Sequence, residues 1–433
     1  MTATMVTDSP VLAKLRDDGA AAFERAPMPT RKDEYWRFTK LRGVELDQVP
    51  AFSPAADDEL VRERIAASLT AATETAGELT HVNSVTVRCE TAADLPEGVV
   101  FAPLLEAALE HTALVEQHLG TVVPVGDSPD DKFVDLNTKH LAGGVFLYVP
   151  RNVRVELPFR ADVVMAGGSV NWRALIVLEE GAEATFVEEF LSTDAEAGRF
   201  SNAVVELVAG ANAHLHYVTV QDYATPVQHF ATHRVHAERD AQVSWSAVGL
   251  GASMGKSRME AHLNGAGSNV KLTGAYFVDG AQQMDYDTYQ LHAAPNATSD
   301  LFFKGVLADK GHAVWRGMIA VAPGAQGTDA FQNNKNLVLN SGAHADSVPG
   351  LTIEANDVRC THASTTSKVD AEQLFYLQAR GITRDEAVRE IVRGFYVDVL
   401  ERIEVEQVRE QVQAALWQRM DRKFGYTADA DDA

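Results

Sequence analysis

Hydrophobic and polar positions divide the chain into three stretches with different periods. The first stretch predicts helices near residues 11–23, 54–75 and 104–119 and a short strand at 84–88. From about residue 140 to 357 apolar and polar residues alternate, a pattern typical of strands. After Ser367 the pattern becomes helical again. We therefore expect a mainly β chain with helices at both ends.

The middle stretch contains a weak repeat, in which a turn residue, a small residue and an alternating strand follow one another. It recurs at Gly181-Ala182, Gly210-Ala211, Asp240-Ala241, Gly267-Ser268, Asn296-Ala297, Gly324-Ala325 and Gly342-Ala343. The intervals between the second residues are 29, 30, 27, 29, 28 and 18. A step in the high twenties without intervening helices favours a β-solenoid with one coil per repeat. A sandwich or barrel, the alternative, usually has turns every 8–12 residues or so.

Three helices are predicted after the repeat. The first covers about residues 370–381, and Thr383 and Glu386 have the form of a capping box that opens the second. Apolar residues then recur at helical steps over residues 388–403 and 408–420. This apolar stripe needs a surface to pack against, which could be the end of the solenoid or another chain.

These patterns divide the chain into four parts. Residues 1–135 are expected to form a helical and mixed N-terminal domain, and residues 136–366 the solenoid. Residues 367–425 are expected to form a C-terminal helical domain. The acidic tail, 426–433, is expected to be disordered.

Composition excludes several classes of function. The 38 Lys and Arg against 61 Asp and Glu give a formal charge of −23, which argues against binding to nucleic acids or to an anionic membrane surface. Cys89 and Cys360 are the two cysteines, so neither a disulfide framework nor a four-cysteine metal site is expected within the chain. The sequence shows no signal-peptide pattern and no apolar run long enough to span a bilayer. We expect a cytoplasmic protein.

Cys360 and His362 are the most notable candidate ligands. They lie two residues apart on a predicted strand, so their side chains point to the same face. Thiolate and imidazole are usual ligands of zinc and of iron–sulfur clusters. Taken alone, the pair is more typical of a buried thiol beside a core histidine.

Two other motifs point to weaker hypotheses. Gly255-Lys256-Ser257 resembles part of a phosphate-binding loop, but the position that requires glycine is Leu250, so nucleotide hydrolysis is not expected. His214 and His216 could bind a metal ion, although solvent-facing strand histidines are the favoured interpretation.

Several runs in the second half closely resemble the SufB/SufD family of iron–sulfur cluster assembly proteins. The resemblance covers roughly residues 140–403. The runs are His292-Ala293-Ala294-Pro295, Phe303-Lys304-Gly305-Val306, Asn333-Asn334-Lys335-Asn336-Leu337-Val338-Leu339, Glu354 to His362, and Leu374 to Ile382. The resemblance to this family implies a right-handed parallel β-helix between helical end domains, which agrees with the repeat.

Within this family the chain is more similar to SufD. The run Glu34-Tyr35-Trp36-Arg37-Phe38-Thr39 resembles the N-terminal signature of SufD. SufB typically has a cysteine where Ser341 precedes Gly342-Ala343-His344, and a glutamate where this chain has Ala363. Against this, SufD usually has Gly-Ala-Thr after the motif histidine, and Thr365-Thr366-Ser367-Lys368 resembles SufB. A SufB-like paralogue is therefore the alternative.

The resemblance also implies partners and site residues. The chain would be a non-catalytic scaffold that pairs with SufB through the β-helix and with the ATPase SufC through its C-terminal helices. His362, with Cys360 beside it, would bind a transient iron–sulfur cluster shared with the partner subunit, and a reduced flavin could act on the complex. The expected partner-binding residues are Leu374, Phe375, Tyr376, Arg380, Gly381 and Phe395.

Three alternatives stay open at this point. The chain could pair with itself rather than with SufB. It could be a carbohydrate-active β-helix enzyme, for which Asp279, Asp285 and Asp287 are the nearest candidate carboxylates. It could also be a purely structural partner in which His362 is a core residue.

Overall fold

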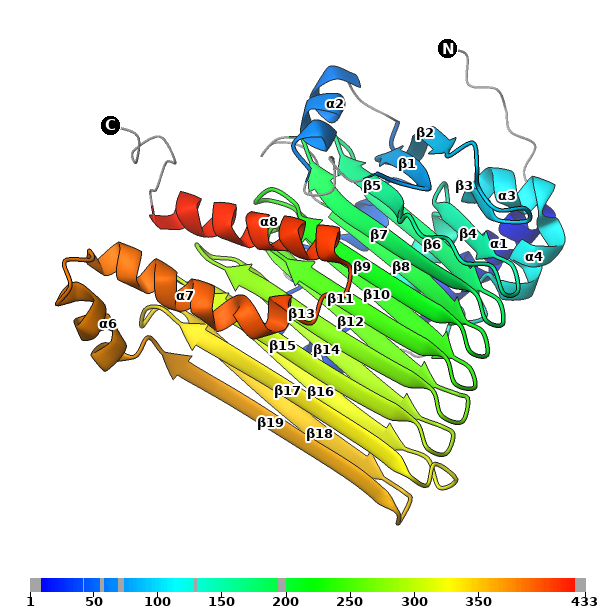
Figure 1. The fold of residues 1–433 in the computed structure, drawn as a ribbon. Coiled ribbons are helices and arrows are strands. Elements are labelled where there is room, and N and C mark those ends of the chain that lie inside the picture. Colours follow the sequence, from blue (N-terminus) through cyan, green and yellow to red (C-terminus); the bar gives the residue numbers. More distant parts are fainter. Residues whose placement is uncertain are drawn as a thin grey trace.

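Two parallel β-sheets, stacked face to face, form the body of the molecule (Figure 1). The computed structural model describes residues 9–41, 43–54, 58–68, 74–127, 131–193 and 200–424. From β4 to β19 the chain alternates between the sheets, so that two strands make one coil and about eight coils follow one another. The predicted parallel β-solenoid is therefore confirmed.

The sheets contain ten and nine strands. The odd-numbered sheet also includes β2 and consists of β1 (Gly77–Val82), β2 (Val85–Thr91), β5 (Phe159–Met165), β7 (Glu183–Ser192), β9 (His214–Asp222), β11 (Gln242–Gly249), β13 (Asn269–Val278), β15 (Thr298–Leu307), β17 (Thr328–Val338) and β19 (Val358–Lys368). The even-numbered sheet also includes β3 and consists of β3 (Val100–Pro103), β4 (Val145–Val149), β6 (Val170–Leu178), β8 (Phe200–Ala209), β10 (Gln228–Ala237), β12 (Met254–Leu263), β14 (Gln283–His292), β16 (His312–Val321) and β18 (His344–Ile353).

The repeat in the sequence corresponds to the turns that join each even-numbered strand to the odd-numbered strand after it, within one coil. Each of these turns has a residue with positive φ, and its N–H donates to a carbonyl of the next coil; these residues are Gly181, Asn212, Asp240, Gly267, Asn296 and Gly327. The hydrogen bonds are 2.7–3.1 Å long and hold successive turns in register. The seventh pair, Gly342-Ala343, precedes β18 at the opposite edge of the solenoid. Its short interval of 18 therefore corresponds to about half a coil.

The interior of the solenoid is tightly packed with apolar and aromatic side chains. Two neighbouring strands show how closely they fit: Gly274 on β13 lies beside Phe303 on β15, and Tyr276 lies beside Gly305. A Cβ atom added at Gly305 would lie 1.8 Å from Cε2 of Tyr276. Glycine is required at positions 274 and 305, because the aromatic ring on the neighbouring strand occupies the space that a side chain at each position would need.

The interior also holds a buried polar cluster. The carboxylate of Glu188 accepts hydrogen bonds from Nε1 of Trp172 at 2.9 Å and from the hydroxyl of Tyr217 at 2.5 Å. The Tyr217 hydroxyl also lies 2.8 Å from Nδ1 of His233. Burial raises the pKa of Glu188 to about 7 and lowers the pKa of His233 to about 3.

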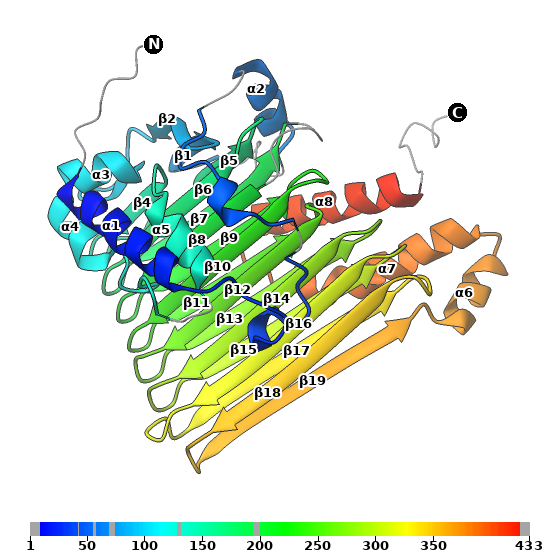
Figure 2. The same ribbon diagram turned by 180° about the vertical axis from the view of Figure 1, so that it is seen from behind.

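Helices cover the outer faces of both sheets (Figures 1 and 2). On the even-numbered sheet lie N-terminal helices and the segment from about residue 28 to 49, where Trp36 stacks on Phe133 with ring centroids 4.9 Å apart. On the odd-numbered sheet lie the two long C-terminal helices. The helices are α1 (Pro10–Arg25), α2 (Asp58–Ala66), α3 (Leu104–Glu110), α4 (Thr112–His118), α5 (Lys132–Lys139), α6 (Ala371–Gln378), α7 (Arg384–Leu400) and α8 (Glu406–Phe424).

Several expected elements appear with changes. The helix predicted over residues 104–119 is two helices separated at His111. The capping box of Thr383 and Glu386 is confirmed at the start of α7. The apolar stripe of α7 and α8 packs against the flat face of the odd-numbered sheet rather than against the solenoid end, because that face presents valines and phenylalanines along its outer side.

The N-terminal part contributes strands as well as helices. β1 pairs parallel with β5, β2 continues the sheet as a hairpin, and β3 pairs antiparallel with β4. The domain boundaries near residues 135 and 366 stay predictions, and the tail predicted at 426–433 lies outside the described residues. In the part of the chain that the structure describes, no helix is long and apolar enough to cross a membrane.

Replacing Gly305 by alanine is expected to destabilise the solenoid. The Tyr276 ring cannot easily move, because its hydroxyl donates to Oδ1 of Asn336 at 2.6 Å. We expect the free energy of unfolding to fall by about 2–3 kcal/mol, the scale of overpacking in a core. Chemical denaturation measures this. Gly324→Ala is the matched control, since an added Cβ there meets nothing within 4 Å. Equal stability of the two variants would contradict the close packing.

Glu188 is expected to make stability fall as pH rises toward 8. Its pKa is raised from the ordinary 4.5 to about 7, so over this range the unfolded state has lost a proton that the folded state retains. The free energy of unfolding of the wild type, minus that of Glu188→Gln, should fall by about 2 kcal/mol between about pH 5.5 and about pH 8. Urea denaturation at both pH values provides the measurement. A difference that does not change with pH would show that Glu188 titrates normally.

Candidate functional site

The last coil, formed by β18 and β19, leaves one end of the solenoid open (Figure 1). Each of these strands pairs with one neighbour, and its other edge has no partner within the described chain. Leu351 and Ile353 on β18 are 37% and 41% exposed there, although they stand in register with the buried Ile319 and Val321 of the coil before. An uncovered strand edge with exposed apolar residues is typical of a surface that pairs with another protein.

Cys360 and His362 lie at this open end, near the start of β19. They stand in register with Ala330 and Gln332 of β17, both of which are fully buried inside the solenoid. Because side chains two residues apart share a face, Cys360 and His362 point to the interior side of the last coil. Cys360 is half-buried against the apolar cluster of the coil before, and His362 is exposed. The two predicted ligands are thus side by side at the rim.

Their surroundings determine what chemistry they can offer. Cys360 is a free cysteine, and partial burial together with the nearby carboxylate of Asp329 raises the pKa of its thiol. The thiol is therefore protonated at neutral pH and would lose its proton when a metal ion binds. Among the described residues, no third His, Cys, Asp or Glu completes a three-ligand group with Cys360 and His362.

A layer of buried amides lies directly beneath this rim. Gln332 donates to the carbonyls of Gly317 and Gly350, both at 3.3 Å. Nδ2 of Asn336 donates to Oδ1 of Asn334 at 2.7 Å, and so does the hydroxyl of Ser347 at 2.5 Å. A layer of hydrogen-bonded polar side chains therefore lies beneath the open end. The sequence did not identify this layer as part of the site.

The predicted partner-binding residues lie on α6, on its C-terminal turn and on α7. Phe375 and Tyr376 are 73% and 56% exposed, and the guanidinium of Arg380 lies 3.4 Å from the centre of the Tyr376 ring. Gly381 has a φ of +88°, which ends α6. Leu374 is buried against α7.

Phe395 is turned toward the solenoid rather than outward. It is half-buried, and Nζ of Lys304 lies 4.5 Å from its ring centre. The same Lys304 donates to the carbonyl of Phe395 at 2.6 Å. Leu374 and Phe395 thus hold the helices in place, whereas Phe375, Tyr376 and Arg380 form a surface.

A groove of about 490 Å³ lies between α6 and α7 beside that surface. Its lining combines apolar and acidic side chains: Glu372, Gln373, Tyr376, Leu377, Glu390 and Ile391. A partner with a complementary apolar and basic surface would fit it.

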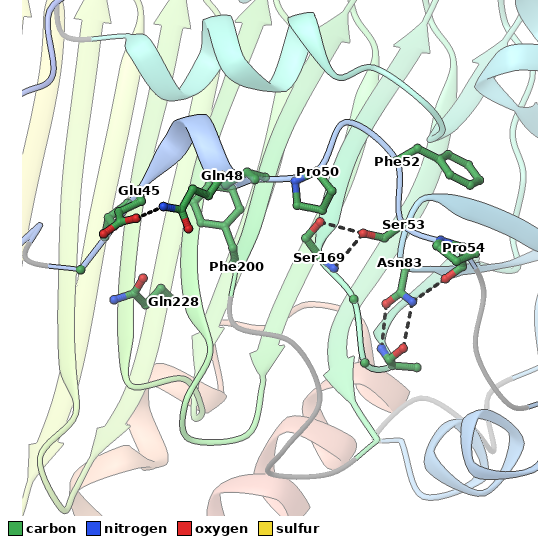
Figure 3. Close-up of a pocket in the computed structure, with 16 residues that line it drawn as sticks. Glu45, Gln48, Pro50, Phe52, Ser53, Pro54, Asn83, Ser169, Phe200 and Gln228 are labelled. Atoms are coloured by element: carbon green, nitrogen blue, oxygen red, sulfur yellow. Dashed lines mark hydrogen bonds between the residues drawn. The ribbon is translucent and has the colours of Figure 1, made fainter.

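Another pocket lies between the segment 43–54 and the start of the solenoid (Figure 3). It measures about 780 Å³. Several of its polar groups already bond to one another: Asn83 donates to the carbonyl of Pro54 at 2.7 Å, and the hydroxyls of Ser53 and Ser169 are 3.0 Å apart. Its described lining residues include no Lys or Arg that could receive a phosphate group. The pocket includes none of the predicted site residues.

The carboxylates considered for carbohydrate chemistry do not meet in an open cleft. Asp285 and Asp287 are buried beneath the N-terminal segment, where both pair with Nζ of Lys256, at 3.2 and 2.5 Å. Asp279 lies at a turn and pairs with Arg419 of α8 at 2.6 Å. These ion pairs fasten the flanking segments to the solenoid, so the geometry does not favour the enzyme hypothesis.

One group of potential metal ligands lies at a place that the sequence did not indicate. His214 and His216 do not belong to any group of three potential ligands among the described residues. His312, His344 and Asp346 do form one. Sequence reasoning missed it because its members come from two successive coils.

Comparisons with known proteins agree with this architecture. A family profile described as SUF system FeS cluster assembly, SufBD core domain, matches residues 163–395. A second profile, described as SufBD protein N-terminal region, matches residues 3–161.

Similar proteins occur in staphylococci. An Iron-sulfur cluster assembly SufBD family protein of Staphylococcus saprophyticus is 30% identical over 301 residues, which cover 69% of this chain and 64% of the relative. Relatives with the same family description in Staphylococcus epidermidis and Staphylococcus haemolyticus are 29% identical over the same shares. The match thus spans less than two thirds of the length of these relatives. Because the core profile alone covers more than half of the chain, the chain belongs to the SufBD family of iron–sulfur cluster assembly proteins.

Proposed function

We propose that the chain is a SufD-like scaffold subunit of a SufBCD complex, on which a nascent iron–sulfur cluster forms at the interface with SufB. The observation that carries this proposal is the open last coil, where Cys360 and His362 stand side by side on the interior side of β19. The cluster is the product being assembled, and the chain itself is not an enzyme in this proposal.

The incomplete ligand set supports a shared site. An iron–sulfur cluster is usually held by four protein ligands, and this end of the chain offers one thiol and one imidazole. The missing ligands would come from SufB, whose own β-helix would extend the two open edges at β18 and β19. Ligands divided between two subunits also allow release, because separating the subunits breaks the set. A second copy of this chain is the alternative occupant of the same edges.

The surface of α6 supports a second partner, the ATPase SufC. Phe375 and Tyr376 are large, exposed and adjacent to the groove between α6 and α7. Exposed aromatic residues beside a groove are typical anchors of a protein interface. Lys304 and Phe395 tie α7 to β15, so movement of the helices would be transmitted to the solenoid.

Sequence features favour the SufD-like role over the SufB-like alternative. Ser341 and Ala363 stand where SufB would supply a cysteine and a glutamate. The proposal places the protein in the cytoplasm. We assign any reduced flavin to the assembled complex, because the described lining of the pocket beside segment 43–54 has no cation for a flavin phosphate.

Replacing His362 by alanine is expected to remove the cluster but not the complex. His362 is exposed, so the substitution is expected to remove a ligand with little effect on folding. We expect the iron–sulfur absorbance of the anaerobically purified complex, co-expressed with SufB and SufC, to fall at least ten-fold per complex.

His214→Ala is the matched control, since His214 is also an exposed histidine at the start of a strand in the same sheet. It should leave both complex and cluster unchanged. Cluster content that stays normal in His362→Ala would refute the ligand role. Purification of this chain as a homodimer that excludes SufB would refute the shared site.

Replacing Phe375 and Tyr376 together by alanine is expected to weaken SufC binding at least ten-fold, the usual result of removing two interface anchors. Both are exposed, so the fold should be retained, and circular dichroism checks this. Surface plasmon resonance with immobilised SufC measures the affinity. Val87→Ala, an exposed apolar residue on β2, is the control. Unchanged SufC affinity of the double variant would exclude α6 as the docking surface.

A further inference from the structure

Three potential metal ligands meet on the outer face of the last two coils of the even-numbered sheet. His312 begins β16, His344 begins β18, and Asp346 follows on β18. Nε2 of His312 lies 2.8 Å from Oδ2 of Asp346, and Nε2 of His344 lies 3.2 Å from Oδ1 of the same carboxylate. The ligand atoms of all three lie within 4.8 Å of one another. One carboxylate thus stands between two imidazoles.

The solenoid ladder fixes the backbone of this group. His312 and His344 stand in register, with ring centroids 5.4 Å apart. The N–H of His312 donates to the carbonyl of Gln282, and that of His344 to the carbonyl of Gly311, both at 2.9 Å. The ligands therefore project from neighbouring strands that cannot slide past each other, and binding requires adjustment of side chains only.

The donor set and its spacing suit a transition metal ion. Ligands about 2.0–2.1 Å from a tetrahedral zinc ion lie about 3.3 Å from one another. The two His–Asp distances are already close to this value. Two imidazoles and one carboxylate suit zinc or iron(II) better than calcium or magnesium, which prefer oxygen ligands. The side chain of His344 is 68% exposed, so the remaining coordination positions face solvent.

A second histidine pair in the same sheet shows why the carboxylate matters. His236 and His262 also stack on neighbouring strands, with centroids 5.3 Å apart, and Glu260 lies beside them. Both oxygens of Glu260, however, bind the guanidinium groups of Arg234 and Arg258, which would repel a cation. In the described part of the chain, no Lys or Arg forms an ion pair with Asp346, which pairs with the two histidines.

We infer that His312, His344 and Asp346 form a binding site for one divalent transition metal ion, with zinc as the expected occupant. The site is separate from Cys360 and His362, because His344 and Asp346 lie at the start of β18 in the even-numbered sheet, whereas Cys360 and His362 lie beyond the turn at the other end of β18, on β19 of the odd-numbered sheet. A bound ion would join β16 to the edge strand β18 and stiffen the open end. This inference does not depend on the proposed function.

The test uses the full chain without an affinity tag, freed of metal by a chelator. Cys360→Ser and His362→Ala are introduced together as the background, so that their pair does not bind the added ion. Equilibrium dialysis with zinc measures stoichiometry and Kd, and absorbance with cobalt(II) reports the coordination geometry. We expect one ion per chain in this background. His344→Gln and Asp346→Asn should each weaken binding at least ten-fold and alter the cobalt spectrum.

The paired variant His236→Gln with His262→Gln is the matched control and should bind zinc as the background does. Circular dichroism confirms that each variant is folded. The inference is overturned if the background binds no zinc at micromolar concentration. It is equally overturned if His344→Gln and Asp346→Asn bind as tightly as the background, or if the control variant loses the ion instead.

Discussion

The backbone ladder between successive coils is the constraint on which the rest of this molecule depends. Each coil is held to the next through two parallel strand pairings and through the N–H groups at its turns. Because these bonds fix the register, equivalent residues of successive coils form columns along the solenoid. The side chains of a column inside the solenoid have to fit next to one another. Gly274 and Gly305, for example, make room for the rings of Phe303 and Tyr276. A column outside is free to hold ligands or packing helices.

The same ladder ends at β18 and β19, whose outer edges have backbone N–H and C=O groups without a strand partner in the described chain. β18 and β19 have one pairing neighbour each, so the interior columns reach the last coil without a next coil to cover them. Leu351 continues the column of the buried Ile319 and is exposed, and His362 continues a column whose preceding member, Gln332, is fully buried. The place where the fold is incomplete is thus also the place where the candidate ligands lie. A partner that continues the ladder would complete the fold and the ligand set together.

The flanking segments divide the outer surfaces between them. The N-terminal segment covers much of the even-numbered sheet and buries Asp285 and Asp287 with Lys256, while α7 and α8 cover the odd-numbered sheet. α6 packs against α7 through Leu374 and presents Phe375 and Tyr376 to solvent. The molecule therefore offers an open solenoid end, an acidic and apolar groove at α6, and the outer group at His312, as three separate surfaces.

The sequence by itself determined the local features of this protein. Period-two alternation and the recurring turn residues predicted the solenoid, the capping box predicted the start of α7, and the two-residue spacing predicted that Cys360 and His362 share a face. Each of these depends on neighbours along the chain. Only the tertiary packing of the coils and the flanking segments decided the other features. It set the sheet that the apolar stripe of α7 and α8 covers, the burial of Asp285, and the contact between His312 and His344 of successive coils. Those contacts join residues brought together only when the coils align, because the register of the ladder, and not local sequence, sets which side chains become neighbours.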